Sequence, residues 1–504
     1  MKRAVTVGLL LILPFSAAVA AGADEEGGRS RLLEVGLSGS PDTLDPQGTT
    51  GTLTFQTMRS VYDTLVEPNE EGEIVPALAR SYEVSEDGRV WRFDLREGVT
   101  FHHGRGFDAE DVVATLNRVT DDSFGSPNAQ EFELIENVVA EDDYTLRIEL
   151  TEPHAPLLAT LASGWSAILP ADLIEAGHDF GAQPVGTGPF SFVEWNRDSA
   201  LVLERNDSYW KEGEPWLEGV RFNIITERAV QAQSLMGGEL HVADLIVEPE
   251  LSMIRQHPQT RVDEAPSSLV MVLAMNTDRS PLSDPRLREG IAHAVDRQAV
   301  MDFAYSGGET VGTFMNPTNR FYVDYTDMYP YDLAEARERI AAAGETRELV
   351  LTLPQNYEPH VKAGELYQEM LEAAGLEVSI QLVDWSSWLS EVFRGGQYDL
   401  TVIGHTGKLD PHGRLAPFAG EDNYVGWEDP EATRLINEAR RTFDEDRRRE
   451  LYGEVLEIMA REVPFVFVGS PYRYVGLRRE VGGFVMDPQL DTYDFRRTRL
   501  EGGR

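Results

Sequence analysis

The feature that most constrains the fold is a regular alternation of strand-like and helix-like segments in the second half of the chain. Short apolar runs typical of strands lie at 349–353, 378–383 and 400–403. Apolar residues recur at helical spacing in 332–343, 360–374 and 385–393. Asp332 suits a helix N-cap with Glu335 in the capping-box position, and Gly344 suits the stop. Because short links join the strands and helices, we predict an α/β fold with a parallel sheet and right-handed crossovers.

Two loops at expected strand ends indicate where a ligand binds. In open α/β sheets, ligands bind beyond the carboxyl ends of the strands. One such loop, 38–45, follows a strand expected at 32–37, and the other, 404–414, follows the strand at 400–403. Two α/β lobes that face each other across a hinge form a cleft that can close on a small ligand. We therefore expect the binding site between these two loops.

The remaining sequence divides into an insertion and further α/β pieces. Residues 74–184 contain expected strands at 90–95 and 145–150 and a helix at 109–119, which together predict a separate α+β insertion. The α/β pieces include a helix expected at 55–65 and a strand–helix–strand pattern over 220–245.

A Gly-Thr-Gly-Pro turn at 186–189 leads into alternating apolar residues from Phe190 to Leu203, which predicts a β-hairpin. Gly186 and Gly188 are expected to adopt positive φ, and Pro189 to fix the direction in which the chain leaves the turn.

The N-terminus has the pattern of a secretory signal peptide. Lys2 and Arg3 precede an apolar run from Val5 to Ala21, so we expect export and removal of residues 1–23. The chain contains no cysteine, which leaves no residue for a disulfide or for a lipid anchor after the signal. We therefore expect a periplasmic protein that is not lipid-anchored.

The charge of the chain indicates its environment. The formal net charge is −41, and the 45 basic residues include only four lysines, Lys2, Lys211, Lys362 and Lys408. Carboxylates hold water and counter-ions, and concentrated salt screens their mutual repulsion. We expect a salt-loving source; an acidic surface made for a basic partner is the alternative. This sign of charge argues against nucleic acid as a partner.

Several segments, in order along the chain, resemble one protein family. They are Ser-Pro-Asp-Thr-Leu-Asp-Pro at 40–46, then 95–112, 185–210 and 276–297. In these segments the chain is similar to family 5 of the extracytoplasmic solute-binding proteins, which serve peptide- and nickel-type ABC importers. The second segment departs slightly, because His103 stands where the family usually has Asp.

The resemblance implies a periplasmic-binding-protein-like, two-lobed α/β fold of cluster C, type II, with an extra α+β domain. It also implies three domains. Domain I is expected in three parts, 30–73, 185–272 and 472–504, domain II is the insertion 74–184, and domain III spans 273–471.

The resemblance further implies a periplasmic component that captures a di- or oligopeptide, or a similar small solute, and delivers it to the permease subunits of an ABC importer. Such a protein is a monomer, is not an enzyme and needs no cofactor or metal. By position, Asp410 matches an acidic residue that pairs with the peptide α-amino group in relatives. The expected ligand-binding residues are Ser40, Asp42, Met275, Asn276, Trp385, Trp388, His405, Thr406, Gly407, Asp410, Arg414 and Tyr424.

Other interpretations of these residues stay open. Core packing explains Trp385 and Trp388 as well as ligand stacking does, and Arg414 suits either a ligand carboxylate or an ordinary surface position. Asp410 can simply start a turn. Trp165 is expected in the core, with pocket closure as the alternative.

Two alternative functions also stay open. Asp410-Pro411-His412 resembles a motif of nickel-binding family members, and His405 is close in sequence, so a metal or metal chelate is one alternative ligand. A secreted glycosidase is the other, although no pair of carboxylates is singled out as its acid and base.

Overall fold

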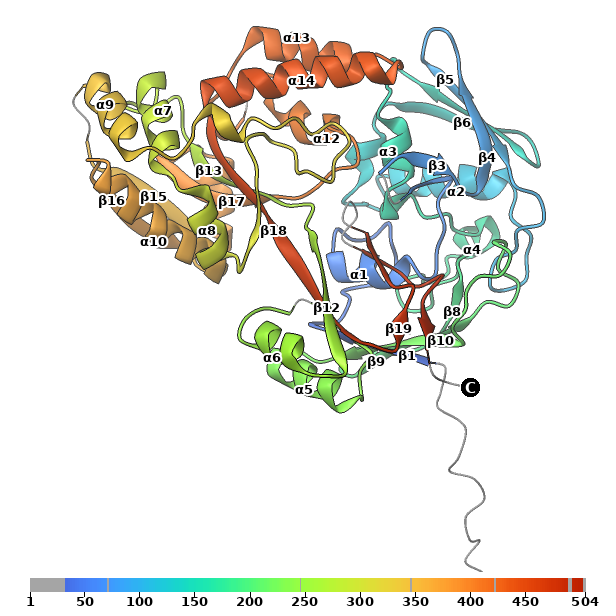
Figure 1. The fold of residues 1–504 in the computed structure, drawn as a ribbon. Helices are drawn as coiled ribbons and strands as arrows, with labels where there is room; N and C mark the ends of the chain where they lie inside the picture. The colour runs from blue at the N-terminus through green and yellow to red at the C-terminus, as the bar shows by residue number, and fades with distance from the viewer. Residues whose placement is uncertain are drawn as a thin grey trace, which may run out of the picture.

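The structure, a computed structural model, describes residues 32–69, 72–244, 246–344, 347–420, 423–487 and 492–501. The expected signal peptide at 1–23 lies outside these residues. Within the described ranges, no helix is both long and apolar enough to cross a membrane. Figure 1 shows one lobe around β15–β17, a second around β1, β9 and β10, and the insertion beside them at the upper right.

One large mixed sheet runs through both lobes. Its strands, in spatial order, are β16 (Val378–Val383), β15 (Leu349–Pro354), β17 (Leu400–His405), β13 (Val270–Met275), β18 (Phe465–Arg478), β11 (Val242–Ala243), β1 (Leu32–Leu37), β10 (Gly219–Ile224), β9 (Ala200–Arg205) and β8 (Phe190–Asn196). The antiparallel pair β8 and β9 is the predicted hairpin.

The predicted strand–helix alternation is confirmed. β15 pairs in parallel with both β16 and β17. The helices between and beside these strands are α7 (Pro285–Ala294), α8 (Arg297–Ala304), α9 (Leu333–Ala343) and α10 (Glu358–Ala373). The helix expected at 385–393 is a short α-helix, α11 (Trp385–Ser387), followed by a π-helix (Trp388–Phe393). The Asp332 carboxylate accepts hydrogen bonds from the backbone N–H groups of Ala334 and Glu335 and so caps α9. The Glu335 carboxylate binds Arg339, so the expected capping role of its side chain is wrong.

The strand β18 connects the two lobes. Its first half pairs with β13, where Ala274 is opposite Phe465. Its second half pairs with β11 and with β12 (Thr260–Pro266) in the other lobe. A single 14-residue strand therefore crosses the hinge, and the expected boundary at 471/472 falls inside it. The domain boundaries stay a prediction.

The insertion has its own sheet, as its pattern predicted. Four antiparallel strands lie in the order β4 (Ala79–Val84), β5 (Val90–Leu95), β7 (Thr145–Leu150) and β6 (Ile135–Asp142). The helix α2 (Ala109–Thr120) contributes buried Val112, Leu116 and Val119 to the same core. Its N-terminus is closed by a capping box between Asp108 and Asp111.

The expected helix at 55–65 is wrong in its extent. The helix α1 (Thr52–Met58) ends early because the chain after it bonds to the Gly-Thr-Gly-Pro turn. Val61 O accepts a 2.9 Å hydrogen bond from the Gly188 N–H. A Cβ atom on Gly186 or Gly188 would lie 2.2 or 2.6 Å from that oxygen. Neither glycine has positive φ, so the predicted reason for them is also wrong: they are needed for close backbone approach.

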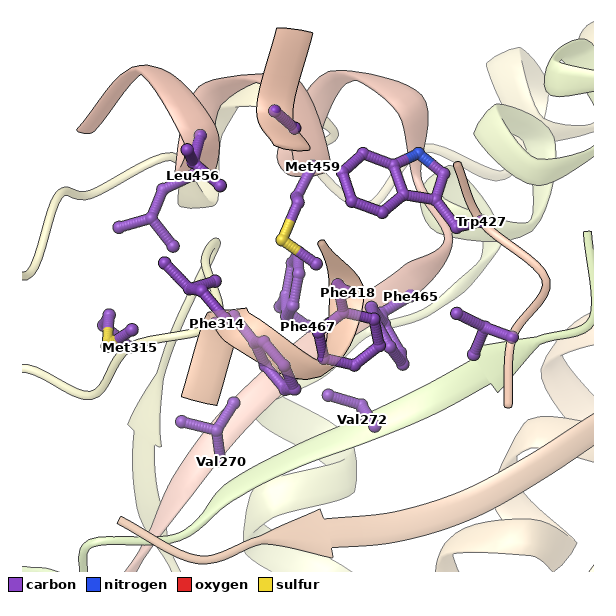
Figure 2. Close-up of a cluster of buried hydrophobic side chains, with 14 of the residues drawn as sticks. Val270, Val272, Phe314, Met315, Phe418, Trp427, Leu456, Met459, Phe465 and Phe467 are labelled. Atoms are coloured by element: carbon purple, nitrogen blue, oxygen red, sulfur yellow. The ribbon is translucent and has the colours of Figure 1, made fainter. Parts of the chain in front are cut away.

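A large apolar core supports the end of β17. Figure 2 shows Phe314, Phe465 and Phe467 packed below Leu456 and Met459 of α14 (Glu445–Glu462). The Phe314 ring meets His405, the last residue of β17, edge-on at 4.7 Å. The core therefore fixes the point from which the 404–414 loop departs.

Candidate ligand-binding cleft

A cavity of about 870 Å³ lies between the lobes. Most of its walls come from five parts of the chain: 46–68, 127–134, 154–167, 406–417 and 492–496. Residues 46–68 and 492–496 belong to one lobe, and 127–134 and 154–167 belong to the insertion. Residues 406–417 belong to the loop after β17. Cavities of this size suit small-molecule ligands. We call this cavity the cleft.

Three of the residues expected to bind ligand line the cleft: Thr406, Gly407 and Asp410. The Gly407 N–H donates a 3.1 Å hydrogen bond to Ser268 Oγ, between β12 and β13. A Cβ atom on Gly407 would lie 2.2 Å from the Ser268 Cβ. Only glycine therefore permits this approach of the loop to the hinge strands.

Arg414 holds the loop in place from behind. Its guanidinium donates to the carbonyl oxygens of Phe314 (3.0 Å), Ser268 (3.0 Å), His405 (3.3 Å) and Thr406 (2.6 Å). The side chain is buried and does not line the cleft. The structure thus places Arg414 as a support for the 404–414 loop.

The carboxylate of Asp410 is already engaged by the protein. Its Oδ2 accepts a 2.6 Å hydrogen bond from Arg448 Nη2, and its Oδ1 accepts one of 2.9 Å from the His412 N–H. A carboxylate has about four acceptor sites, so each oxygen can still accept a further donor. The pairing fixes the direction of the carboxylate before any ligand arrives.

Two histidines meet where the insertion approaches the loop. The rings of His154 and His412 both line the cleft and are arranged edge-to-face, with centroids 5.6 Å apart. Burial lowers the pKa of each imidazole to about 4, so both are neutral at pH 7. Among the described residues, no three His, Asp or Glu side chains are grouped as a metal site requires.

Lys408 reaches from the loop across the cleft to the insertion. Its Nζ lies 3.0 Å from Glu131 Oε1 and 5.3 Å from the centre of the Trp165 ring. Trp165 packs edge-on against Phe55 of α1 at 6.0 Å. Trp165 therefore forms part of the cleft wall and also packs, partly buried, against the core of the insertion, so the expectation of core packing holds in part.

In the wall formed by 46–68 and 492–496, the side chain of Arg496 lies between two carboxylates. Its guanidinium is 2.5 Å from Asp494 and 2.9 Å from Glu67. Burial alone would raise the pKa of Asp494, but the charge of Arg496 outweighs it and lowers the pKa to about 2. Arg59 on the same wall pairs with Asp487 at 3.0 Å. This side of the cleft is thus a preorganised network of charges.

The other expected site residues lie outside the cleft. They are Ser40, Asp42, Met275, Asn276, Trp385, Trp388, His405, Arg414 and Tyr424. Asp42 orders its own loop by accepting hydrogen bonds from Thr49 Oγ1 (2.6 Å) and Thr54 Oγ1 (2.8 Å). Asn276 is buried and donates to Gly396 O at 2.8 Å. Their ligand-binding roles stay predictions.

The expected aromatic residues form a stack within their own lobe. Trp385 and Trp388 are parallel at 5.0 Å, and Trp388 donates to Thr401 Oγ1 at 2.9 Å. His405 and the hydroxyl of Tyr424 are hydrogen-bonded at 2.8 Å, and burial lowers the pKa of His405 to about 3. These contacts give all four side chains a structural explanation within their own lobe.

The family segments contact each other in space. The backbone N–H of His102, in the segment 95–112, donates to Gly186 O at 2.9 Å, and its Nε2 lies 3.0 Å from Gly188 O. Residues 73–426 match the sequence model of the bacterial extracellular solute-binding proteins, family 5 Middle. The chain belongs to this family.

Relatives of this family 5 protein match it over most of its length. Di/tripeptide-binding protein 1 of Pseudomonas aeruginosa is 29% identical over 488 residues, which cover 89% of this chain and 91% of the relative. The dipeptide-binding protein of Escherichia coli is 28% identical over 517 residues, which cover 94% and 95%.

Solved structures confirm the expected two-lobed fold of this family 5 protein. HbpA2 from Haemophilus parasuis superposes with a TM-score of 0.85 at 26% identity, over 93% of this chain and all of that chain. DppA from Helicobacter pylori in complex with peptide STSA gives a TM-score of 0.75 at 27% identity, over 93% and 98%.

Proposed function

We propose that this solute-binding protein captures a short peptide in the cleft and delivers it to the membrane permease of an ABC importer. The observation that carries the proposal is the cleft itself, about 870 Å³ between two lobes with charged groups of both signs on its walls. A peptide carries an ammonium, a carboxylate and amide groups, which such walls can pair. The peptide-binding names of the relatives support this ligand class.

Asp410 is the proposed partner of the peptide α-amino group. Its carboxylate is buried and oriented by Arg448, and it retains acceptor capacity toward the cleft. Thr406 and Gly407 line the cleft beside Asp410 and are the proposed neighbours of the ligand main chain. In this arrangement the protein binds and releases its ligand without chemistry, and closure of the lobes forms the surface that the permease meets.

We also propose a setting for the protein. In this proposal the expected signal peptide exports it to the periplasm, where it acts as a monomer. Its net charge of −41 and its few lysines suit concentrated salt.

Native mass spectrometry of the purified protein tests the ligand class. The buffer should be volatile and of the highest ionic strength that the instrument tolerates, and bound masses should be released by denaturation. A 1:1 complex with short-peptide masses, or with added tripeptides, is the expected result. A metal with an organic chelator, a sugar, or no retention of any added peptide would contradict the proposal.

A further inference from the structure

A second cavity, of about 370 Å³, lies beside the cleft. Ala159, Leu409 and Asp410 line both cavities. The second cavity continues from there between the insertion sheet and the segments around Phe321 and Phe443 of the neighbouring lobe. We call it the side cavity. Its shared walls place it within reach of a ligand held in the cleft.

Aromatic rings form much of the side cavity. Tyr82 of β4 and Trp91 of β5 line it from the insertion, with ring centroids 6.1 Å apart. Phe443 faces Trp91 at 5.7 Å, and Phe321 lies on the same side as Phe443. Tyr82 remains 36% exposed, although it is a large ring in a folded sheet. Trp91 and Phe321 are buried, so Tyr82 and the partly buried Phe443 are the rings that the protein leaves partly uncovered in this cavity.

The guanidiniums that reach the side cavity are already paired. Arg448 binds the Asp410 carboxylate at 2.6 Å, and Arg320 forms an ion pair with Glu445. Both guanidiniums also lie over the Phe321 ring, at 5.6 and 5.8 Å from its centre. A flat apolar group would be stabilised by stacking on the rings and guanidinium planes. A negatively charged group would gain less, because the carboxylates of Asp410 and Glu445 already pair with these guanidiniums.

Contacts around Ala155, which lines the side cavity, hold the insertion against the lobe. The Ala155 N–H donates a 2.7 Å hydrogen bond to Arg440 O. The Glu152 carboxylate lies 2.9 Å from Arg440 and 2.8 Å from Arg441. Because both units supply its walls, a ligand group inside the cavity would touch both and favour their approach.

We propose that the side cavity is an accessory pocket for an aromatic side chain of the bound peptide, and that this group stabilises the approach of the insertion to the lobe. The inference rests on the proposed function. The volume lies at the small end of the range for ligand pockets, which suits one side chain rather than a second ligand.

Filling the side cavity tests the inference. Val84 lines the side cavity but not the cleft, so Val84→Trp fills only the former. Arg80→Trp is the matched control, because Arg80 is exposed on the same strand and lines neither cavity. Calorimetry would compare Ala-Ala-Ala with the three tripeptides that carry one Phe at position 1, 2 or 3.

The wild type and Arg80→Trp should prefer one Phe position over Ala-Ala-Ala by about tenfold. Val84→Trp should lose that preference and bind Ala-Ala-Ala within about twofold of wild type. Tyr82→Ala, which removes an exposed ring, should weaken the preference if Val84→Trp does not fold. Equal binding of all four peptides by the wild type, or a preference that survives both substitutions, would overturn the accessory pocket alone. Failure of every peptide to bind the wild type would overturn the proposed function as well.

Discussion

Asp410 accepts a 2.6 Å hydrogen bond from Arg448, and both side chains are buried beside the cleft. The carboxylate proposed to bind a peptide ammonium therefore has a cationic partner before the ligand arrives. Such a pair fixes the geometry of the carboxylate, and loss of one partner leaves a buried charge uncompensated. Two properties, stability and ligand binding, should consequently depend on the same residue.

Replacing Asp410 with Asn should affect both. Asp410→Asn leaves the Arg448 guanidinium without its counter-charge, so the free energy of unfolding should fall by about 3 kcal/mol. The wild type should bind a free tripeptide more tightly than its N-acetylated form, and the variant should bind both equally. Denaturant titration and calorimetry measure the two effects. Asp446→Asn is the control, because the Asp446 side chain is 92% exposed on α14; a similar loss there would show that the effect is not specific to the cleft.

The close approach of Gly407 to Ser268 should be essential for binding. Gly407→Ala places a methyl group 2.2 Å from the Ser268 Cβ, so the loop must shift, and overpacking of this kind costs about 1–3 kcal/mol. We expect peptide affinity to fall at least about tenfold. Gly237→Ala serves as the comparison, because a Cβ atom there meets nothing within 4 Å. Unchanged affinity in Gly407→Ala would contradict the role given to this loop.

The buried histidines should make the protein less stable as the pH falls. The pKa of His154 and of His412 is about 4 in the folded protein and about 6.5 in the unfolded chain. The unfolded chain therefore binds more protons between these values, so stability is full above about pH 6.5 and falls toward about pH 4. Each histidine accounts for about 3 kcal/mol.

Chemical denaturation between these pH values checks this effect. The double variant with His154→Gln and His412→Gln should show a shallower loss of stability. It should keep part of the slope, because burial lowers the pKa of His360 and His405 as well. A slope equal to that of the wild type would show that neither histidine is held neutral in the fold.

Concentrated salt should stabilise the protein. With a formal net charge of −41, the folded chain repels itself, and molar salt reduces the screening length to about 3 Å. We expect the melting temperature to rise by about 10 °C or more between about 0.05 M and about 3 M potassium chloride. Thermal melts followed by circular dichroism measure this. Equal melting temperatures would argue against a salt-loving source.

The elements that the sequence predicted are those that depend on local pattern. The strands at 349–353 and 378–383 and the hairpin after Pro189 have periodicity or turn residues within a few positions. The turn sequence correctly indicates that glycine is needed at 186 and 188. It does not indicate why, because neither residue has positive φ. What excludes a side chain there is Val61, more than a hundred residues earlier, and a local pattern does not contain that information.

Much of the cleft could not be predicted for the same reason. The 404–414 loop is predictable because it follows a strand. Seven of its residues line the cavity, and three of these seven are expected ligand-binding residues. Arg496, Glu67 and Glu131 come from segments whose meeting depends on the packing of separate units. Lys408, which pairs with Glu131, does stand out in the sequence, because it is one of only four lysines in the chain. Arg414 and Trp388 have residue types that suit a binding site and lie in or near the 404–414 loop in sequence. Tertiary contacts bury both side chains, so neither lines the cavity.

Hydrogen–deuterium exchange with and without a bound tripeptide tests most directly whether the cleft holds the ligand. If it does, backbone amides in 404–414, 127–134 and 492–496 should exchange more slowly in the complex, while the outer strands β8 and β9 should not change. Tight peptide binding without protection in these three segments would contradict the account.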